Sequence, residues 1–132
     1  MNMGAETYPD DLKYHSEHDW IRVEGDQAVF GVTWYAQDNL GDVVFFDPPA
    51  AGDTVSANAS YGELESVKAV SDIYSPIGGE VVAVNDAVVA RPELVNEDPY
   101  GEGWLLRVKI ADVAEIDSLM EPSAYRDYLA GL

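Results

Sequence analysis

The segment 63–72, with the sequence ELESVKAVSD, contains Lys68, one of three lysines in a chain of 132 residues. A lysine amine is a site for acylation as well as a point charge. The small neighbours Ser66 and Ala69 leave this amine accessible, whereas Val67 and Val70 are unusual residues to expose unless another surface covers them. The residues alone leave two interpretations open, an ordinary solvated lysine and an attachment point.

Two carboxylates of this segment, Glu63 and Glu65, share one face if the segment is a strand. Paired carboxylates perform acid and base chemistry in glycosidases. The chain has 25 acidic residues, however, so such pairs arise readily by chance. We therefore interpret the pair as part of a solvated face. An enzyme built on it would need a pocket that raises the pKa of one carboxyl.

A second group of chemically capable residues is His15 and His18, with carboxylates between and after them. These residue types bind zinc. Two histidines three residues apart face the same way only in a helix, and Pro9 upstream and the strand-like segment 20–23 downstream argue for an irregular segment instead. We therefore predict structural histidines and no metal site. The chain also has no cysteine, so sulfur redox chemistry would require an attached group.

The charge balance of the chain excludes several classes of partner. Seven basic and 25 acidic residues leave a formal net charge of −18. Such a charge repels nucleic acid and anionic membranes within the screening length, and it favours partners with basic rims. It also favours a monomer at moderate salt. Adaptation to a high-salt source would produce the same acidity.

The length and apolar content predict one domain over residues 1–132, with a core over about 13–110 and a helical segment over about 111–131. Residues with apolar side chains make up 47% of the chain, enough for a packed interior. The N-terminal segment lacks the basic and apolar regions of a signal peptide, and no apolar run reaches the about 18 residues that span a bilayer. We expect a cytoplasmic protein.

Alternation of apolar and polar residues predicts a mainly β fold. Trp104, Leu106, Val108 and Ile110 fall on one face of the segment 104–110, which is the pattern of a half-buried strand. Further strands are expected over 20–25, 27–32, 42–47, 62–67 and 80–85, separated by Gly, Asp, Pro and Asn. Short strands with this punctuation favour a small antiparallel sandwich or barrel.

Helices are expected to be few and short. Thr33 caps one over 34–40 that ends at Gly41, and Asp112 caps another near the C-terminus. A third begins at Pro122, where proline is tolerated in the first turn. Residues 96–103, NEDPYGEG, are expected to form an ordered surface loop. For Trp34, which follows the first cap, we prefer local packing to a role in partner contact.

The stretch 62–85 reads as strand, tight connection, strand, turn and strand, which places Lys68 at or beside a hairpin tip. In this context the chain resembles the lipoyl-bearing H protein of the glycine cleavage system, from about Lys13 to Tyr125. The resemblance rests on six colinear blocks: HDWIRVEG (18–25), GVTWYAQDNLGDVVFFDPP (31–49), GDTV (52–55), ESVKAVSDIYSPIGGEVVAVN (65–85), PELVNEDPYGEGWL (92–105) and SAY (123–125).

The resemblance implies a fold of two flattened antiparallel sheets of the lipoyl-carrier type, in which Lys68 lies at an exposed β-turn and carries lipoate in amide linkage. Glu65, Ser66, Val67 and Ala69 are then the residues around the attachment point, and Glu65 with Glu63 can help a lipoylating enzyme to recognise the hairpin. The positions that match the family's cleft for the lipoyl arm are Asp19, where the family more often has Glu, and Asp72.

By the same resemblance the chain is a carrier without turnover of its own. The lipoyl group receives an aminomethyl group from glycine decarboxylase, a pyridoxal-phosphate enzyme. An aminomethyltransferase passes the one-carbon unit to tetrahydrofolate, and dihydrolipoamide dehydrogenase reoxidises the dithiol. The resemblance also leaves room for a role as a lipoyl or octanoyl donor to other acceptors.

Four alternatives compete with this interpretation. A biotinyl carrier domain uses the same hairpin, but methionines typically flank its lysine, whereas Val67 and Ala69 flank Lys68. A lipoyl domain of an acyltransferase usually has a DKA core inside a longer chain, whereas this chain has VKA. An enzyme based on the acidic pairs, or a pure interaction module, would function without any modification of Lys68.

Overall fold

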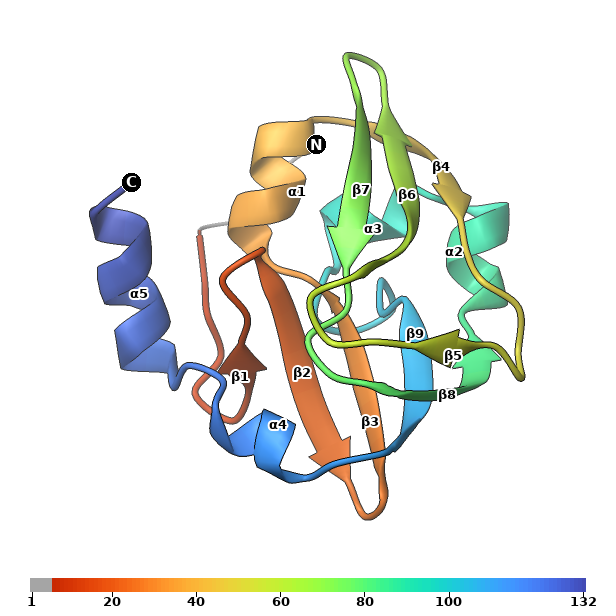
Figure 1. The fold of residues 1–132 in the computed structure, drawn as a ribbon. Coiled ribbons are helices and arrows are strands. Elements are labelled where there is room, and N and C mark those ends of the chain that lie inside the picture. Colours follow the sequence, from red (N-terminus) through yellow and green to blue (C-terminus); the bar gives the residue numbers. More distant parts are fainter. Residues whose placement is uncertain (1–5) are drawn as a thin grey trace.

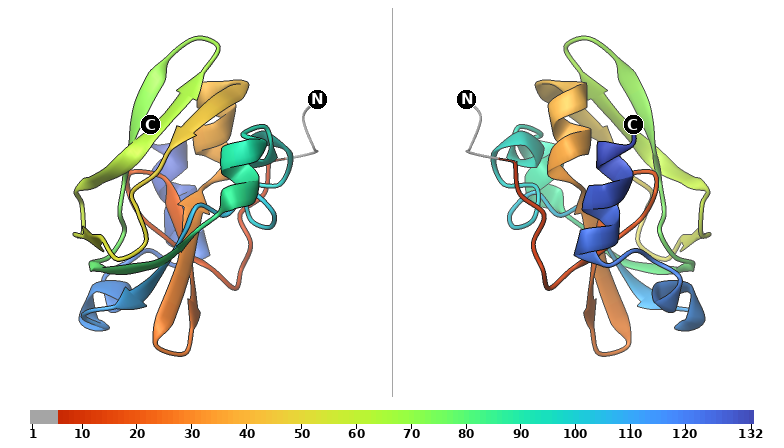
Figure 2. Two further views of the ribbon diagram at one scale, coloured as in Figure 1. Left: turned by 90° about the vertical axis from the view of Figure 1, so that its right-hand side faces the viewer. Right: turned by 90° about the vertical axis from the view of Figure 1, so that its left-hand side faces the viewer.

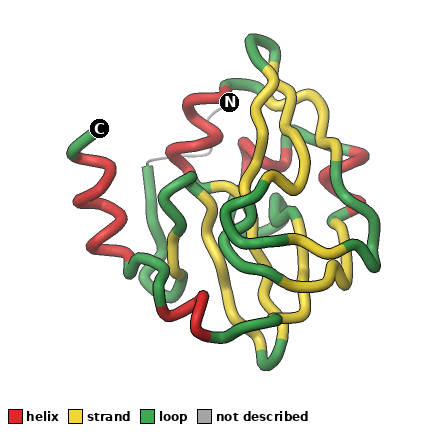
Figure 3. Tube along the Cα trace, in the orientation of Figure 1, coloured by secondary structure: helices red, strands yellow, loops and turns green. Residues whose placement is uncertain are grey.

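The computed structural model describes residues 6–132 and contains two antiparallel sheets with short helices around them (Figures 1 and 3). The first five residues of the domain predicted over 1–132 lie outside the described part. The larger sheet has the strand order β1-β2-β3-β9-β8-β5, and the smaller has the order β4-β6-β7. The larger sheet comprises β1 (Lys13–Tyr14), β2 (Asp19–Glu24), β3 (Gln27–Val32), β5 (Thr54–Val55), β8 (Gly79–Val84) and β9 (Leu106–Ile110). The smaller comprises β4 (Val43–Asp47), β6 (Ser60–Ser66) and β7 (Val70–Tyr74).

Strand β9 follows the expected alternation, whereas β3 is buried at every position after Gln27. In β9, Leu106 and Val108 are fully buried, whereas the side chains between and after them are partly or fully exposed. The β2–β3 hairpin turns at Gly25, whose φ of 67° is readily adopted only by glycine. The smaller sheet faces the larger one, and the main core lies between them. The fold class predicted from the sequence is confirmed, with the sheets forming a flattened sandwich that is not closed into a barrel.

The main core joins the two sheets through large apolar side chains. Phe46 and Leu64 from the smaller sheet and Phe30 and Leu106 from the larger one are at most 1% exposed. Phe30 also packs edge-to-face against Tyr61 of β6, with ring centroids 5.4 Å apart. Removal of this apolar surface from water holds the smaller sheet, and therefore the Lys68 hairpin, in place on the body.

A second cluster is aromatic and attaches the C-terminal helix α5 (Pro122–Ala130) to the larger sheet. Tyr125 of α5 stacks on Tyr14 of β1, with ring centroids 4.7 Å apart and planes 6° from parallel. Tyr8 packs edge-to-face against both rings. Trp34 is partly buried against this cluster, as the packing interpretation predicted.

The predicted helices are present. Helix α1 (Trp34–Leu40) is capped by Thr33, whose side chain accepts a hydrogen bond from the Ala36 amide, and Gly41 ends it at a φ of 77°. Helix α4 (Ala114–Asp117) begins after Asp112, whose carboxylate accepts from the Ala114 amide at 3.0 Å. Helix α5 has Pro122 in its first turn, as predicted.

Two helices were not predicted. Helix α2 (Asp86–Ala90) is capped by Asn85, but its valines favour a strand in sequence-based reasoning. Helix α3 (Leu94–Glu97) extends into the segment 96–103 that was expected to be a loop. Leu94 and Val95 of α3 are buried in the main core, so tertiary packing stabilises a helix of only one turn.

The β6–β7 hairpin projects beyond the body of the molecule, at the end opposite the β2–β3 turn (Figures 1 and 2). Helix α1 lies beside it in Figure 1. Within residues 6–132, no helix has the length and apolar character needed to cross a membrane.

Candidate cofactor-attachment site

Val67 and Lys68 form the tip of the β6–β7 hairpin, closed by Ser66 and Ala69. The Ser66 amide donates to the Ala69 carbonyl at 2.8 Å. The Ser66 hydroxyl oxygen accepts from the amides of Ala69 at 3.1 Å and Lys68 at 3.3 Å. A serine side chain therefore satisfies the turn amides in place of the glycine or asparagine that tight hairpins usually use.

The Lys68 side chain is exposed, and no described carboxylate lies within ion-pair distance of its amine. The methylene stem of Lys68 lies near the end of α1. Its Cε is 3.5 Å from the position that a Cβ atom would take at Gly41. The Val67 amide donates to the Asp42 carbonyl at 3.0 Å, which ties the tip to the body. The structure thus places the amine in solvent at the hairpin tip, on a backbone that is held on both sides.

The outer face of the smaller sheet combines apolar and acidic side chains. Phe45, Glu65 and Val70 are paired across β4, β6 and β7 in one row, and Glu63 pairs with Asp72 in the next row on the same face. Phe45 is 50% exposed and Val70 is 59% exposed, while Val67 at the tip reaches 70%. Exposed apolar side chains beside carboxylates are typical of a surface that meets a partner.

A cleft of about 380 Å³ begins beside Ala69 and runs along β7. Strand β7 is the outermost strand of the smaller sheet. The wall opposite β7 is formed by α1 and by residues 15–18, which lead from β1 into β2 and are called the entry segment. The lining residues are Glu17, His18, Val32, Tyr35, Ala36, Asn39 and Leu40 on that side, and Ala69, Val70, Ser71, Asp72, Ile73 and Tyr74 on the other. The cleft has an apolar floor with Glu17 and Asp72 as its two carboxylates.

The structure separates the two acids predicted for the cleft. Asp72 lines it, whereas Asp19 is 1% exposed and is not among the lining residues. The Tyr61 hydroxyl donates to Asp19 Oδ2 at 3.2 Å, and Asp19 Oδ1 is the one buried side-chain oxygen or nitrogen without a hydrogen-bond partner in residues 6–132. Burial raises the pKa of Asp19 well above its usual 3.8, and the Tyr61 hydrogen bond opposes this shift.

Most lining residues were not predicted as cleft residues, and Glu17 and His18 are the polar ones of the entry segment. The sequence offers these two only as candidate metal ligands, although the block HDWIRVEG, which begins at His18, marks this segment. His18 donates or accepts a hydrogen bond with the Tyr125 hydroxyl through Nδ1 at 2.8 Å. Burial lowers the pKa of His18, and the Glu17 charge partly opposes this effect.

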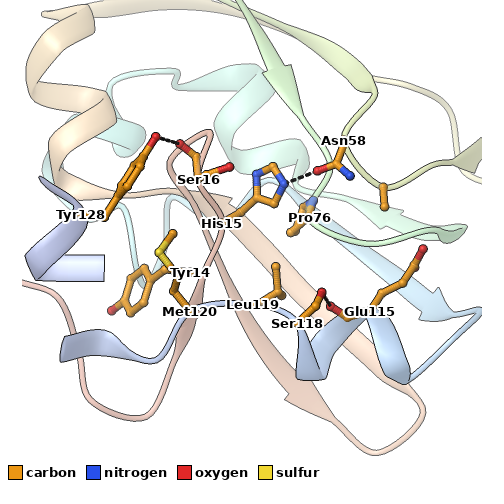
Figure 4. A pocket seen from close by; sticks show the side chains of 11 residues that line it. Tyr14, His15, Ser16, Asn58, Pro76, Glu115, Ser118, Leu119, Met120 and Tyr128 are labelled. Atoms are coloured by element: carbon orange, nitrogen blue, oxygen red, sulfur yellow. Dashed lines mark hydrogen bonds between the residues drawn. The ribbon is translucent and has the colours of Figure 1, made fainter. Parts of the chain in front are cut away.

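His15 lies outside the cleft, in a separate cavity of about 400 Å³ (Figure 4). Its Nδ1 accepts from the Glu17 amide at 3.1 Å, so that Nε2 carries the proton and donates to Asn58 Oδ1 at 2.6 Å. No group of three or more potential metal ligands occurs in residues 6–132. The hydrogen bonds of His15 and of His18 Nδ1 are those of structurally anchored histidines.

The residues around Lys68 fit a long acyl group in amide linkage. The amine is exposed and lacks an ion pair with any described residue, and acylation would remove its charge without leaving a buried acid unpaired. An apolar-floored cleft begins one residue away, at Ala69, and would cover apolar methylene groups. With the lysine stem, a lipoyl arm is on the order of 14 Å long when extended.

Comparisons with known proteins agree with this geometry. A family model described as "Glycine cleavage H-protein" matches residues 12–131. The chain is 51% identical to the glycine cleavage system H protein of Carboxydothermus hydrogenoformans, over 92% of this chain and 93% of that protein. It is 52% identical to the probable glycine cleavage system H protein of Haloarcula marismortui, over 92% of this chain and 95% of that protein.

A solved structure shows the same fold. The crystal structure of a glycine cleavage system H protein from Mycobacterium marinum superimposes with a TM-score of 0.85 at 40% identity, covering 95% of this chain and all 100% of that one. The family model spans nearly the whole chain, and relatives of about half-identical sequence cover 92% of it. The chain therefore belongs to the glycine cleavage H-protein family, the lipoyl carriers of the glycine cleavage system.

Proposed function

We propose that Lys68 bears lipoate in amide linkage and that this lipoyl-lysine is the moving arm of the carrier. The observation that carries the proposal is the placement of an exposed amine, unpaired within residues 6–132, at the tip of a projecting hairpin. The tip is secured by the Ser66 hydroxyl and by the Asp42 carbonyl, so the attachment point stays in place while the arm moves. Tethering replaces free diffusion of the cofactor with a high local concentration.

The residues of the chain supply a shelter for the arm. The cleft along β7 would take the apolar part of the arm against Val32 and Leu40, and Asp72 and Glu17 would meet a positive charge at its end. When attached, the lipoyl disulfide supplies a thiol carrier for the aminomethyl group and a dithiol pair for electron transfer. Asp19, the first residue of β2, is proposed to support the same wall through its buried carboxyl group.

The partners of the proposed carrier are glycine decarboxylase, the tetrahydrofolate-dependent aminomethyltransferase, dihydrolipoamide dehydrogenase and a lipoylating enzyme. Each must reach the same hairpin tip. The exposed Val67 and Val70 would fill apolar depressions around a partner's active-site entrance, and the acids of the outer face would meet basic residues at its rim. The chain itself is proposed to perform no catalytic step.

Intact mass spectrometry tests the attachment directly. With a lipoylating enzyme, ATP and lipoate, wild type should gain the mass of lipoate less one water, and Lys68→Ala should gain nothing. Lys109→Ala is the matched control, because Lys109 is also an exposed strand-associated lysine and should be modified like wild type. Both substitutions should change the free energy of unfolding by less than about 0.5 kcal/mol.

Reconstituted glycine cleavage then tests the carrier role. Lys68→Ala should support no turnover at any concentration, whereas Lys109→Ala should match wild type. Glycine cleavage supported by folded Lys68→Ala protein would disprove the proposal. An added mass equal to biotin less water would favour the biotinyl carrier instead.

A further inference from the structure

His18 occupies an unusual position in the wall of the cleft. Its φ is 75°, a left-handed conformation that is uncommon for residues other than glycine and is retained mainly where surrounding contacts enforce it. The His18 amide donates to the His15 carbonyl at 2.8 Å, and the His18 carbonyl accepts from the Thr33 amide at 2.9 Å. The backbone is thus held at a bend between β1 and β2.

The imidazole itself is held by aromatic side chains from α1 and α5. Tyr125 holds Nδ1 by its hydroxyl at 2.8 Å, and the rings of Tyr35 and Tyr128 lie 4.6 and 5.9 Å from the imidazole, centroid to centroid. Tyr125 is immobile because it is fully buried and stacks on Tyr14. This support fixes the orientation of the ring.

The other ring nitrogen, Nε2, remains available to the cleft. It forms no hydrogen bond with residues 6–132, and it is also not among their buried atoms that lack a partner. An atom with no partner that is not sealed from solvent must reach open space, and His18 lines the cleft. Nε2 is therefore an unpaired polar atom that open space reaches, on a residue that lines the cleft.

The support of His18 allows Nε2 to act as a hydrogen-bond acceptor. The Tyr125 hydroxyl lies between His18 Nδ1 and the Thr33 hydroxyl, at 2.8 and 2.9 Å. These hydrogen bonds can be donated from His18 Nδ1–H to Tyr125 and from Tyr125 to Thr33, which leaves Nε2 without a proton. They can also be donated in the opposite direction, from Thr33 to Tyr125 and from Tyr125 to Nδ1, which puts the proton on Nε2. Both directions keep the Tyr125 hydroxyl bonded to His18 and Thr33, so the anchor is retained in either tautomer. Only the second direction gives the Thr33 hydroxyl hydrogen an acceptor among residues 6–132, so the tautomer with a bare Nε2 requires a ligand that donates to Nε2.

We propose that His18 is a positioning residue for the arm, whose Nε2 accepts a hydrogen bond from an amine carried at the arm's end. The proposal rests on the proposed function and adds to it a residue and an atom. Glu17 of the entry segment and Asp72 of β7 line the same cleft, and His15 lies two residues before Glu17. The imidazole of His18 is in contact with three tyrosine side chains, those of Tyr35, Tyr125 and Tyr128. The two carboxylates attract the positive charge of an ammonium group, and His18 Nε2, on a ring held in place, orients its hydrogen bond.

A hydrogen-bond acceptor such as His18 Nε2 can affect the stability of an amine carried on the arm through a thioether. A thioether that carries an amine on the same carbon expels its thiolate when the nitrogen lone pair is free, leaving a carbon–nitrogen double bond. A proton on the nitrogen occupies that lone pair, so acceptors that stabilise the ammonium form also protect the thioether. His18 with the two carboxylates would thus slow the loss of the cargo in water.

The test combines NMR with a lifetime measurement. In ¹⁵N-labelled lipoylated protein, the ring nitrogens of His18 should shift when glycine decarboxylase and glycine load the arm, and those of His15 should not. Tyr125→Phe should alter the His18 tautomer ratio, because it removes the hydroxyl bonded to Nδ1. Tyr128→Phe is the matched control, since it keeps a ring beside His18 and removes only a hydroxyl that bonds to Ser16.

The lifetime of the loaded amine is followed by intact mass after the decarboxylase is removed. His18→Asn is the variant of choice, because asparagine tolerates the left-handed backbone but is too short to reach into the cleft. Its cargo should be lost about three- to tenfold faster than that of wild type, as expected for one hydrogen bond of ordinary net strength. Circular dichroism checks that the variant is folded.

The outcomes separate this inference from the proposed function. Wild type that never gains mass at Lys68 would overturn the proposed function and the inference with it. Wild type that loads normally, with unchanged His18 nitrogen shifts and with an equal cargo lifetime in His18→Asn, would overturn the inference alone.

Discussion

Tyr61 and Asp19 form a buried hydrogen bond that joins the two sheets: the Tyr61 hydroxyl on β6 donates to the Asp19 carboxylate on β2 at 3.2 Å. Asp19 has no arginine, lysine or histidine partner in residues 6–132, and one of its oxygens is unsatisfied. Because a buried charge without a cation is unfavourable, this pair carries a free-energy cost that depends on pH.

The pH dependence of stability should therefore change in Asp19→Asn. Burial raises the pKa of Asp19 in the folded state, so its favourable contribution is present in full below about pH 4 and is lost as the pH rises through the folded-state value. Asparagine keeps an acceptor for Tyr61 and stays neutral. The variant should gain about 1 to 3 kcal/mol over wild type at about pH 8 relative to about pH 4. Urea unfolding at both pH values measures this gain, and a stability difference that is the same at both would contradict it.

Glu65→Ala should slow lipoylation more than it lowers stability. Glu65 is exposed on the outer face, three residues before Lys68, and its side chain makes no hydrogen bond or ion pair with residues 6–132. The free energy of unfolding should change by less than about 0.5 kcal/mol. Rates of mass gain at limiting lipoylating enzyme provide the measurement. Glu80→Ala, an exposed glutamate on β8 of the other sheet, is the control, and equal modification rates for Glu65→Ala and wild type would end the idea.

Ser66→Ala should loosen the hairpin tip. It removes the oxygen that accepts from the Lys68 and Ala69 amides, at a cost of about 1 kcal/mol. Hydrogen exchange at the Ala69 amide should accelerate, whereas exchange at Leu64 in the same strand should change much less. Ser60→Ala is the control, since its hydroxyl bonds only to the nearby Gly62 carbonyl. Unchanged protection of Ala69 would show that the backbone alone holds the turn.

Val67→Ala should weaken partner binding without a loss of stability. Val67 is 70% exposed at the tip, and Val113, at 68%, is an equally exposed valine before α4. If a partner buries Val67, truncation should cost about 1 kcal/mol of binding free energy, or about a fivefold loss of affinity. Titration of the lipoylated variants against glycine decarboxylase measures this loss, with Val113→Ala as the reference. Equal affinities for the two variants would remove Val67 from the interface.

Association with the partners should also be salt-dependent. The formal charge of −18 and the acids around the tip would speed association with a basic surface, and ions screen this attraction. The association rate constant should fall steeply between about 0.05 and 0.5 M salt, while the dissociation rate constant changes little. Stopped-flow kinetics across this range tests the prediction, and a salt-independent association rate would refute it.

The local features of the site were predictable because they depend on neighbours in the sequence. The alternation in β9 placed Leu106 and Val108 inside, and Thr33 and Gly41 marked both ends of α1. The hairpin around Lys68 followed from two short strands with a tight connection between them. The C-terminal helix followed from Pro122. Each of these signals acts over a few residues, where chain geometry leaves few alternatives.

The helices α2 and α3 were missed because distant contacts stabilise them. Val88 and Val95 are fully buried under other elements, and that burial outweighs a weak local preference for helix. Distant contacts also decide the surroundings of Asp19, which the sequence predicted as a cleft residue. Its full burial depends on Tyr61, 42 positions further along the chain.

The sequence by itself determined the family, the fold class and the lysine at the hairpin tip, because blocks of adjacent residues encode all three. Only the tertiary structure decided which side chains share the cleft. His18, Tyr35 and Asp72 come from three separate elements, and Tyr125, which orients His18, comes from a fourth. No spacing along the chain encodes that meeting, because it arises only when the aromatic cluster and the two sheets pack together.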